Sequence, residues 1–228
     1  MMLLQIEGLQ SFYGRSQALF NVNLSMEEGQ VVALMGRNGM GKTTTIRSLC
    51  RIMPYRHGNV RFLDRDLAAM RPHRVARLGI GLVPEGRRCF PNLSVHENLV
   101  VAARPGAWSL ERVGLLFPRL RERQNQMART LSGGEQQMLA IGRALMTNPK
   151  LLILDEATEG LAPVIRQEIW AAVRELKGEG QSILIVDKTL KELMRVADRC
   201  TILERGANVW DGAPADLDGD IQDRFLGV

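Results

Sequence analysis

The sequence predicts an α/β fold with a mostly parallel sheet core, N-terminal antiparallel strands and a helical subdomain. Three observations favour this fold class. Short apolar runs alternate with amphipathic segments of helical spacing, which is the pattern of layered α/β proteins. A glycine-rich loop stands between one apolar run and a helix-like segment, and another apolar run ends in two adjacent acidic residues. The 228 residues suffice for one sizeable core and a smaller insert.

Composition and charge exclude several classes of protein. Of the residues 45% are hydrophobic, and no apolar run approaches the roughly 20 residues that span a bilayer. Residues 1–7 lack the basic start and apolar stretch of a secretory signal. The net charge of +5 is not accompanied by interleaved aromatic residues, so solvated helix faces explain it better than a nucleic-acid or membrane surface. We expect a cytoplasmic protein without a nucleic-acid partner.

The three cysteines, Cys50, Cys89 and Cys200, are scattered along the chain. Their spacing supports neither a disulfide framework nor a C-x-x-C metal site, so we expect reduced and partly buried thiols. The histidines also lack the spacing of metal ligands. Any metal in this protein should therefore be magnesium that arrives with a nucleotide.

The first strands are expected at residues 3–9 and 19–26, separated by a turn-rich stretch at residues 11–16. Tyr13 lies in that stretch. Its ring offers a π-surface on which an adenine could stack. The alternative is an ordinary hairpin aromatic without a ligand.

A phosphate-binding loop is predicted directly after the strand at residues 31–35. The spacing is G-x-x-x-x-G-K-T, and the helix that follows continues from Thr44. Glycines let successive backbone N–H groups converge on phosphate oxygens, and the helix adds its positive N-terminal end. We expect Lys42 to reach the β- and γ-phosphates and Thr43 to place its hydroxyl on Mg²⁺. The predicted loop comprises Gly36, Arg37, Asn38, Gly39, Met40, Gly41, Lys42 and Thr43.

A helical insert is predicted in the middle of the chain. The short strand expected at residues 80–83 ends at a polar loop that contains Glu85. Ser94 and Glu97 then fit a capping box, in which each side chain satisfies a free amide of the first helical turn. The pattern from there to about residue 130 is helical, and we interpret residues 92–149 as the insert.

Within the insert, Ser132, Gly133 and Gly134 open another helix. Small residues at a helix start expose backbone amides and the positive end of the helix dipole, which suits an anion. Taken alone this would be an ordinary serine-capped helix. The phosphate-binding loop elsewhere in the chain favours the functional interpretation.

The apolar run at residues 151–154 predicts a buried strand that delivers Asp155 and Glu156 at its carboxyl end, where ligands of open α/β sheets bind. Asp155 can hold Mg²⁺ directly or through water, and Glu156 can orient or deprotonate an attacking water. The spacing of apolar residues then predicts a helix at residues 165–176, a strand at 183–186 and a helix at 190–197.

With these three motifs in order, the whole chain resembles the ATP-binding subunits of ABC transporters. Several segments are similar to the branched-chain amino acid uptake group of that family, and two segments also resemble the related urea or short-chain amide importers. The first set is residues 83–88, 116–120, 134–146 and 159–163, and the second is residues 10–14 and 36–39.

The resemblance implies a single ABC ATPase domain over residues 1–228, with a nucleotide-binding lobe at 1–91 and 150–228 and the insert at 92–149. It implies hydrolysis of ATP with Mg²⁺ to drive import through a membrane permease, on the cytoplasmic face of the cell membrane. ATP would lie between the phosphate loop of one subunit and the Ser132–Gly134 signature of another. The partner would be a second ATPase subunit, or another copy in isolation, and a periplasmic solute-binding protein would take part indirectly.

The resemblance also assigns catalytic positions, two of which depart from the general family pattern. Glu85 stands where a glutamine is usual, and Lys188 stands where a histidine usually contacts the γ-phosphate. A lysine ammonium can only donate hydrogen bonds, whereas a neutral imidazole donates and accepts. A catalytically weak regulatory subunit is therefore an alternative to an ATPase in which Glu156, Lys188 and Glu85 act. An ABC ATPase of DNA repair or translation would need coiled-coil or duplicated domains that this length does not allow.

Overall fold

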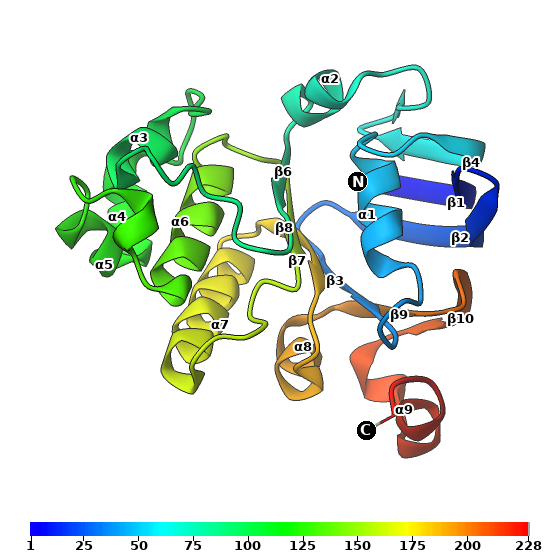
Figure 1. Ribbon diagram of the computed structural model, residues 1–228. Helices are drawn as coiled ribbons and strands as arrows, with labels where there is room; N and C mark the ends of the chain where they lie inside the picture. The colour runs from blue at the N-terminus through cyan, green and yellow to red at the C-terminus, as the bar shows by residue number, and fades with distance from the viewer. Residues whose placement is uncertain (228) are drawn as a thin grey trace.

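Two β-sheets with helices packed between and around them make up residues 1–227, the part of the chain that this computed structural model describes (Figure 1). The first sheet has the order β2 (Ser16–Glu27), β1 (Met2–Tyr13), β4 (Tyr55–Phe62) and β5 (Arg65–Asp66). The second has the order β10 (Ala207–Gly212), β9 (Arg199–Glu204), β3 (Val31–Met35), β8 (Ser182–Val186), β7 (Leu151–Asp155) and β6 (Ile80–Val83).

The pairing within the two sheets confirms the predicted fold class. The strands of the first sheet pair antiparallel throughout. In the second sheet β9, β3, β8, β7 and β6 run parallel, and β10 is added antiparallel at the β9 edge. Because the five parallel strands point the same way, their carboxyl ends meet at one edge of the sheet, which is where a ligand is expected.

The N-terminal hairpin is longer than predicted, and the expected turn over residues 11–16 is wrong. β1 continues to Tyr13, which pairs with Ser16, so the turn consists of Gly14 and Arg15. Ser11 is fully buried, and its hydroxyl lies 2.7 Å from that of Ser48 in helix α1 (Lys42–Leu49). A polar residue that looked like part of a turn is thus held in the strand by a tertiary hydrogen bond.

The central sheet separates two hydrophobic cores. Every residue of β3 is buried, and alternate side chains face opposite sides: Val31 and Ala33 contribute to one core, and Val32 and Leu34 to the other. This is the two-residue periodicity of a strand covered on both faces. The core on the Val32 side includes apolar residues of α1 and of the antiparallel sheet, and the core on the Val31 side includes those of helices α6 (Gly133–Leu145) and α7 (Pro163–Gly178).

The predicted helical insert is helical in the structure and lies on the side of the central sheet away from the antiparallel sheet (Figure 1). Within residues 92–149, all of which are described, neither sheet has a strand. The predicted capping box is present: the Ser94 hydroxyl accepts from the Glu97 amide at 3.1 Å, and the Glu97 carboxylate accepts from the Ser94 amide at 2.7 Å. Besides α6, the insert contains α3 (Val95–Val100), α4 (Leu110–Leu116), α5 (Pro118–Glu122) and a short 3-10 turn (Ala128–Thr130).

The remaining helices are α2 (Pro72–Arg77), α8 (Leu190–Val196) and α9 (Gly219–Phe225), with a 3-10 turn at Pro214–Asp216. The sequence interpretation did not identify β9, β10 or α9. Cys50 and Cys200 are buried more completely than expected, while Cys89 is half-buried. No helix in residues 1–227 combines the length and apolar character that a bilayer crossing requires.

Candidate nucleotide-binding site

The carboxyl ends of four parallel strands bring the predicted site residues together. The phosphate loop follows β3, Glu85 follows β6, Glu156 follows β7 and Lys188 follows β8. A cavity of about 330 Å³ lies at this edge. Its lining consists of Asn38, Gly39, Gly41, Lys42, Thr43, Thr44, Glu85, Glu156, Glu159 and Lys188. Residues that are far apart in the sequence therefore share one cavity.

The phosphate loop has a shape that only glycine permits at its two ends. Gly36 has φ +132°, and a Cβ there would lie 2.3 Å from the carbonyl oxygen of Leu203. Gly41 has φ +105°, and its Cβ would lie 2.7 Å from a methyl group of Leu19. Side chains at these positions would clash and would favour other backbone conformations. The glycines predicted from spacing are thus required by close packing against β9 and β2.

Lys42 lies at the start of α1 with its side chain curled back over the loop. Its ammonium donates to the carbonyl oxygens of Gly36 at 2.7 Å and of Arg37 at 3.0 Å. Burial lowers the pKa of this lysine, and the nearby Glu156 and Asp155 oppose that shift. The ammonium is therefore a buried cation inside the loop, where it can turn to phosphate oxygens with little reorganisation.

Thr43 and Asp155 contact each other directly, so their oxygen atoms are close enough to bind one metal ion. The Thr43 hydroxyl donates to Asp155 Oδ1 at 3.2 Å. Asp155 is buried, and burial raises its pKa while the bond from Thr43 opposes the increase. Mg²⁺ prefers hard oxygen ligands and usually takes one or two from the protein. A hydroxyl and a carboxylate that meet beside the phosphate loop fit such an ion.

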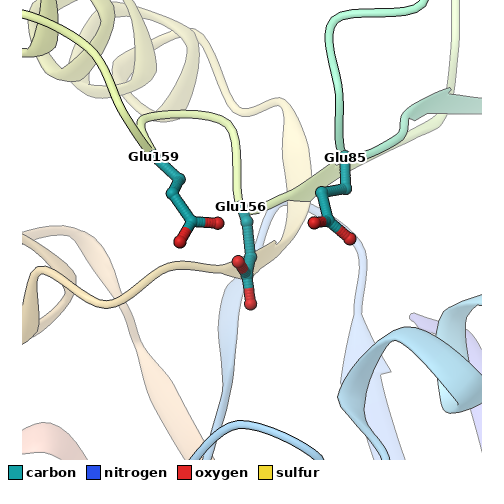
Figure 2. Close-up of side chains that lie close together, drawn as sticks. All are labelled: Glu85, Glu156 and Glu159. Atoms are coloured by element: carbon teal, nitrogen blue, oxygen red, sulfur yellow. The ribbon is translucent and has the colours of Figure 1, made fainter.

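Three carboxylates converge on the cavity from two loops, as Figure 2 shows. Glu85 comes from the loop after β6, and Glu156 and Glu159 come from the segment after β7; their carboxylate oxygens lie within 4.8 Å of one another. Glu156 has φ +52°, and its amide donates to the carbonyl oxygen of Val186 at 2.8 Å. A hydrogen bond with Glu159, aided by burial, raises the pKa of Glu156 to about 7.

Lys188 points into this acidic group, with half of its side chain exposed. Its ammonium donates to Glu159 Oε1 and lies 3.8 Å from Glu156 Oε2. The bond to Glu159 raises the pKa of Lys188, and the bonds from Glu156 and Lys188 lower that of Glu159. The lysine that replaces the usual histidine therefore faces the predicted catalytic carboxylate.

Tyr13 lies near the loop but is not enclosed by it. Its side chain is exposed, and its hydroxyl lies 3.3 Å from that of Thr44. An exposed ring at the margin of a phosphate loop remains available to stack on a base. Met40 contributes its backbone to the loop, whereas its sulfur accepts from the Arg205 amide at 3.1 Å.

The predicted signature residues lie outside the cavity that the phosphate loop lines. Ser132, Gly133 and Gly134 form the N-terminal end of α6 and do not line the cavity around the phosphate loop of the same chain. Ser132 is exposed and caps α6 by accepting from the Glu135 amide at 3.3 Å, while Glu135 accepts from the Ser132 amide at 2.8 Å. One chain therefore does not bring these two anion-binding helix ends together.

Two features of the site were missed at the sequence level. No role is predicted for Glu159 from the sequence, because only the fold shows that it bridges Glu156 and Lys188. A second cavity, of about 390 Å³, adjoins the other side of the phosphate loop and is lined in part by Leu190, Leu193 and Leu226. No sequence motif marks Leu226, which lies directly after α9.

Comparisons with known proteins agree with this geometry. A family model described as ABC transporter matches residues 19–159. The chain is 39% identical to the high-affinity branched-chain amino acid transport ATP-binding protein BraG of Pseudomonas aeruginosa, over 99% of this chain and 100% of that protein. It is 31% identical to the lipopolysaccharide export system ATP-binding protein LptB of Escherichia coli, over 100% of this chain and 98% of that protein.

Solved structures give the same result. The ADP conformation of MJ1267, an ATP-binding cassette of an ABC transporter, superposes with a TM-score of 0.84 at 26% identity, covering 98% of this chain and 96% of that one. A nucleotide-free ATP-binding cassette from an ABC transporter gives a TM-score of 0.83 at 26% identity, covering 100% and 96%.

Proposed function

The chain belongs to the ABC transporter family of ATP-binding subunits, and from this premise we propose that it energises the import of branched-chain amino acids through a membrane permease. It is an ATPase whose activity is coupled to transport. The observation that carries the substrate class is the 39% identity to BraG over the full length of both chains. Urea or a short-chain amide is the second candidate, because residues 10–14 and 36–39 also resemble those importers.

ATP binding rests on the phosphate loop. The amides of residues 36–43 and the ammonium of Lys42 receive the β- and γ-phosphates, and the exposed ring of Tyr13 stacks on the adenine. Thr43 and Asp155, already in contact at 3.2 Å, hold Mg²⁺. When bound, this ion neutralises the charge that develops on the phosphate oxygens.

Hydrolysis requires a base near the γ-phosphate. Glu156 lines the same cavity as Lys42 and Thr43, and with a pKa of about 7 it can accept a proton from water at neutral pH. Glu85, from the loop after β6, orients the water from the other side. The contacts that Lys188 makes with Glu159 and Glu156 support this set of residues as one acid–base group.

Lys188 makes this ATP site slow. A histidine at this position could accept a hydrogen bond from the attacking water, but an ammonium whose pKa is raised by Glu159 stays protonated and only donates. It still attracts the γ-phosphate. The site therefore binds ATP well and hydrolyses it slowly, and in the extreme case the chain is a regulatory nucleotide-binding subunit.

ABC cassettes work as dimers together with membrane permeases. In the arrangement we propose, Ser132, Gly133 and Gly134 contact the γ-phosphate of ATP held by the phosphate loop of a second, different ATPase subunit. Support comes from the exposure of Ser132 and from the position of this helix end outside the cavity of its own chain. In isolation a second copy of this chain takes the place of the partner.

The permease contacts the helical insert and the loop that carries Glu85. Phe90 and Val101, at either side of α3, are about half exposed, which fits a surface covered by a partner. We infer that the subunit lies on the cytoplasmic face of the membrane and that a periplasmic solute-binding protein acts indirectly. Residues 1–91 and 150–228 act as the nucleotide-binding lobe and residues 92–149 as the helical lobe, in keeping with the confinement of both sheets to the former.

Reconstitution tests the function. The chain is assembled with its permease and second ATPase subunit in proteoliposomes, with both ATPase subunits facing the lumen and the solute-binding protein added outside. Uptake of labelled leucine is measured with and without ATP in the lumen. ATP-dependent uptake of leucine supports the proposal. Uptake of urea or acetamide without leucine would assign the second candidate. ATP binding to this chain without turnover, in a complex whose partner carries glutamine in place of its catalytic glutamate, would assign a regulatory subunit.

A further inference from the structure

The loop that carries Glu85, residues 84–90, lies along helix α6 and touches it near both ends. Near the start of the helix, the Arg87 guanidinium covers Gly133, where an added Cβ would lie 2.4 Å from Nη1. One turn later, the Cys89 thiol lies 3.1 Å from the carbonyl oxygen of Gln136 and donates to it. Near the end of the helix, Arg143 donates from Nη2 to the carbonyl oxygen of Arg88 at 2.5 Å.

Arg143 makes two contacts with this loop. Its guanidinium lies 4.9 Å from the centre of the Phe90 ring, a cation–π contact that adds to its bond with Arg88. Within residues 1–227 no carboxylate pairs with Arg143, and its Nη1 atom is buried without a hydrogen-bond partner. The side chain of Arg143 is partly buried, and a guanidinium taken out of water in this way needs polar contacts from the protein. The interactions that hold this one come from the Glu85 loop.

The loop has a backbone conformation that needs such support. Arg87 and Arg88 have φ values of +66° and +36°, in the left-handed region that non-glycine residues rarely occupy. Two adjacent residues of this kind persist only where surrounding contacts hold them. The contacts to α6 are therefore candidates for what keeps the loop in place.

We propose that Arg143 is a positioning residue that fastens the Glu85 loop to α6, so that Glu85 moves with the helix whose first residues are the signature. The inference rests on the proposed function, because it matters only if Glu85 and Ser132 act at two ATP sites. Ser132 caps the N-terminal end of α6, and Arg143 lies near the other end of the same helix. Engagement of the signature by the partner's nucleotide would thus be transmitted to Glu85 in this chain's own site, without a contact between Arg143 and either nucleotide.

Thiol labelling of the isolated full-length chain tests whether Arg143 holds the Glu85 loop against α6. Arg143→Met removes the hydrogen bond and the charge while keeping an apolar stem of similar length. Labelling of Cys89, followed by mass spectrometry, should become faster by about tenfold or more, the size expected when a hydrogen bond from a charged donor is lost. Cys50 and Cys200 are buried in the cores and serve as internal standards for global unfolding. Arg143→Lys should give an intermediate rate.

The matched control is Arg112→Met. Arg112 also stacks on an aromatic ring, that of Trp108 at 4.1 Å, and also makes a bond through Nη2, here to Glu179, but it does not contact the Glu85 loop. This control should leave the labelling of Cys89 unchanged. If Arg143→Met proves too unstable to purify, Arg143→Lys is compared with Arg112→Met instead. Equal rates of Cys89 labelling in these two variants would overturn the proposal.

The effect on catalysis is read in the assembled complex with the partner's catalytic glutamate changed to glutamine, so that only this chain's site turns over. Arg143→Met should lower kcat by about tenfold and leave the dissociation constant for ATP unchanged. Faster labelling with an unchanged kcat would show that the tie is structural only and would reject the positioning role. If the complex with native Arg143 and the changed partner does not hydrolyse ATP, this result would instead count against the proposed function. The labelling result would still decide whether Arg143 holds the loop.

Discussion

The ammonium nitrogen of Lys188 lies 3.8 Å from Glu156 Oε2. The same ammonium donates to Glu159, whose hydrogen bond raises the pKa of Glu156 to about 7. The cation and the second carboxylate therefore act on the proton affinity of Glu156 in opposite directions. These opposing influences explain why we expect ATP binding and ATP hydrolysis to be affected differently by substitutions in this site.

Replacement of Lys42 by alanine should weaken ATP binding by roughly 10- to 100-fold or more, because it removes the buried cation that the loop offers to the β- and γ-phosphates. Titration of the isolated chain with a fluorescent ATP analogue measures the affinity. Lys191→Ala, an exposed lysine on α8, is the matched control and should bind normally. Equal affinities for the two variants would mean that Lys42 does not contact the phosphates.

Glu156→Gln should leave ATP affinity intact and slow hydrolysis at its own site by about 10²–10⁴-fold, because the amide keeps the shape of the side chain but cannot accept a proton. Single-turnover hydrolysis in the isolated chain measures this step, and size-exclusion chromatography should show ATP-bound dimers accumulating. The exposed Glu111→Gln serves as control. Native turnover in Glu156→Gln would assign the base to another residue, with Glu159 the first candidate.

Ser132→Arg should reduce the turnover of the assembled complex by about tenfold or more, because the signature would present bulk and a misplaced charge to ATP held by the partner. ATP binding to the isolated chain should be unaffected. Loss of ATP binding in the isolated chain would show that the signature acts on its own site, and the head-to-tail arrangement would be wrong.

The buried thiol of Cys50 predicts a dependence of stability on pH. Burial raises its pKa to about 12, against about 8.5 for an exposed thiol. The folded state therefore holds this proton more tightly than the unfolded state, and the stability due to Cys50 is complete below pH 8.5 and declines as the pH rises toward 12. At pH 9.5 the loss should be about 1.4 kcal/mol relative to pH 7.5.

Urea unfolding at these two pH values measures this loss. Cys50→Ala should be less stable at both, since it leaves a cavity, but the drop between pH 7.5 and pH 9.5 should be smaller than in the unaltered chain by about the same 1.4 kcal/mol. An equal drop in both proteins would show that the thiol does not contribute.

The parts of the site that a single segment encodes were predictable from the sequence. The phosphate loop, Asp155 and Glu156 owe their positions to local spacing and to strand ends, and the Ser94 and Ser132 caps owe theirs to a residue three positions away. These features need no knowledge of distant contacts. The structure brings Lys42, Thr43, Asp155 and Glu156 to one edge as the alternation of strands and helices implied.

The features that could not be predicted from the sequence depend on contacts between distant segments. Ser11 resembles a turn residue until its partner Ser48, 37 positions away, is known. Lys188 and Glu159 are separated by 29 positions, and nothing in either segment indicates the other. The strand β9 pairs with β3, so its place in the sheet is fixed by a partner more than 160 positions earlier in the chain.

The asymmetry between the two ATP sites is tested most directly in the complete complex of both ATPase subunits and the permease. Glu156→Gln in this chain is compared with the equivalent change in the partner, and steady-state ATP hydrolysis is measured for each. If Lys188 makes this site slow, the change in this chain should remove only a small part of the activity, while the change in the partner should remove most of it. An equal loss from the two changes would contradict the slow site.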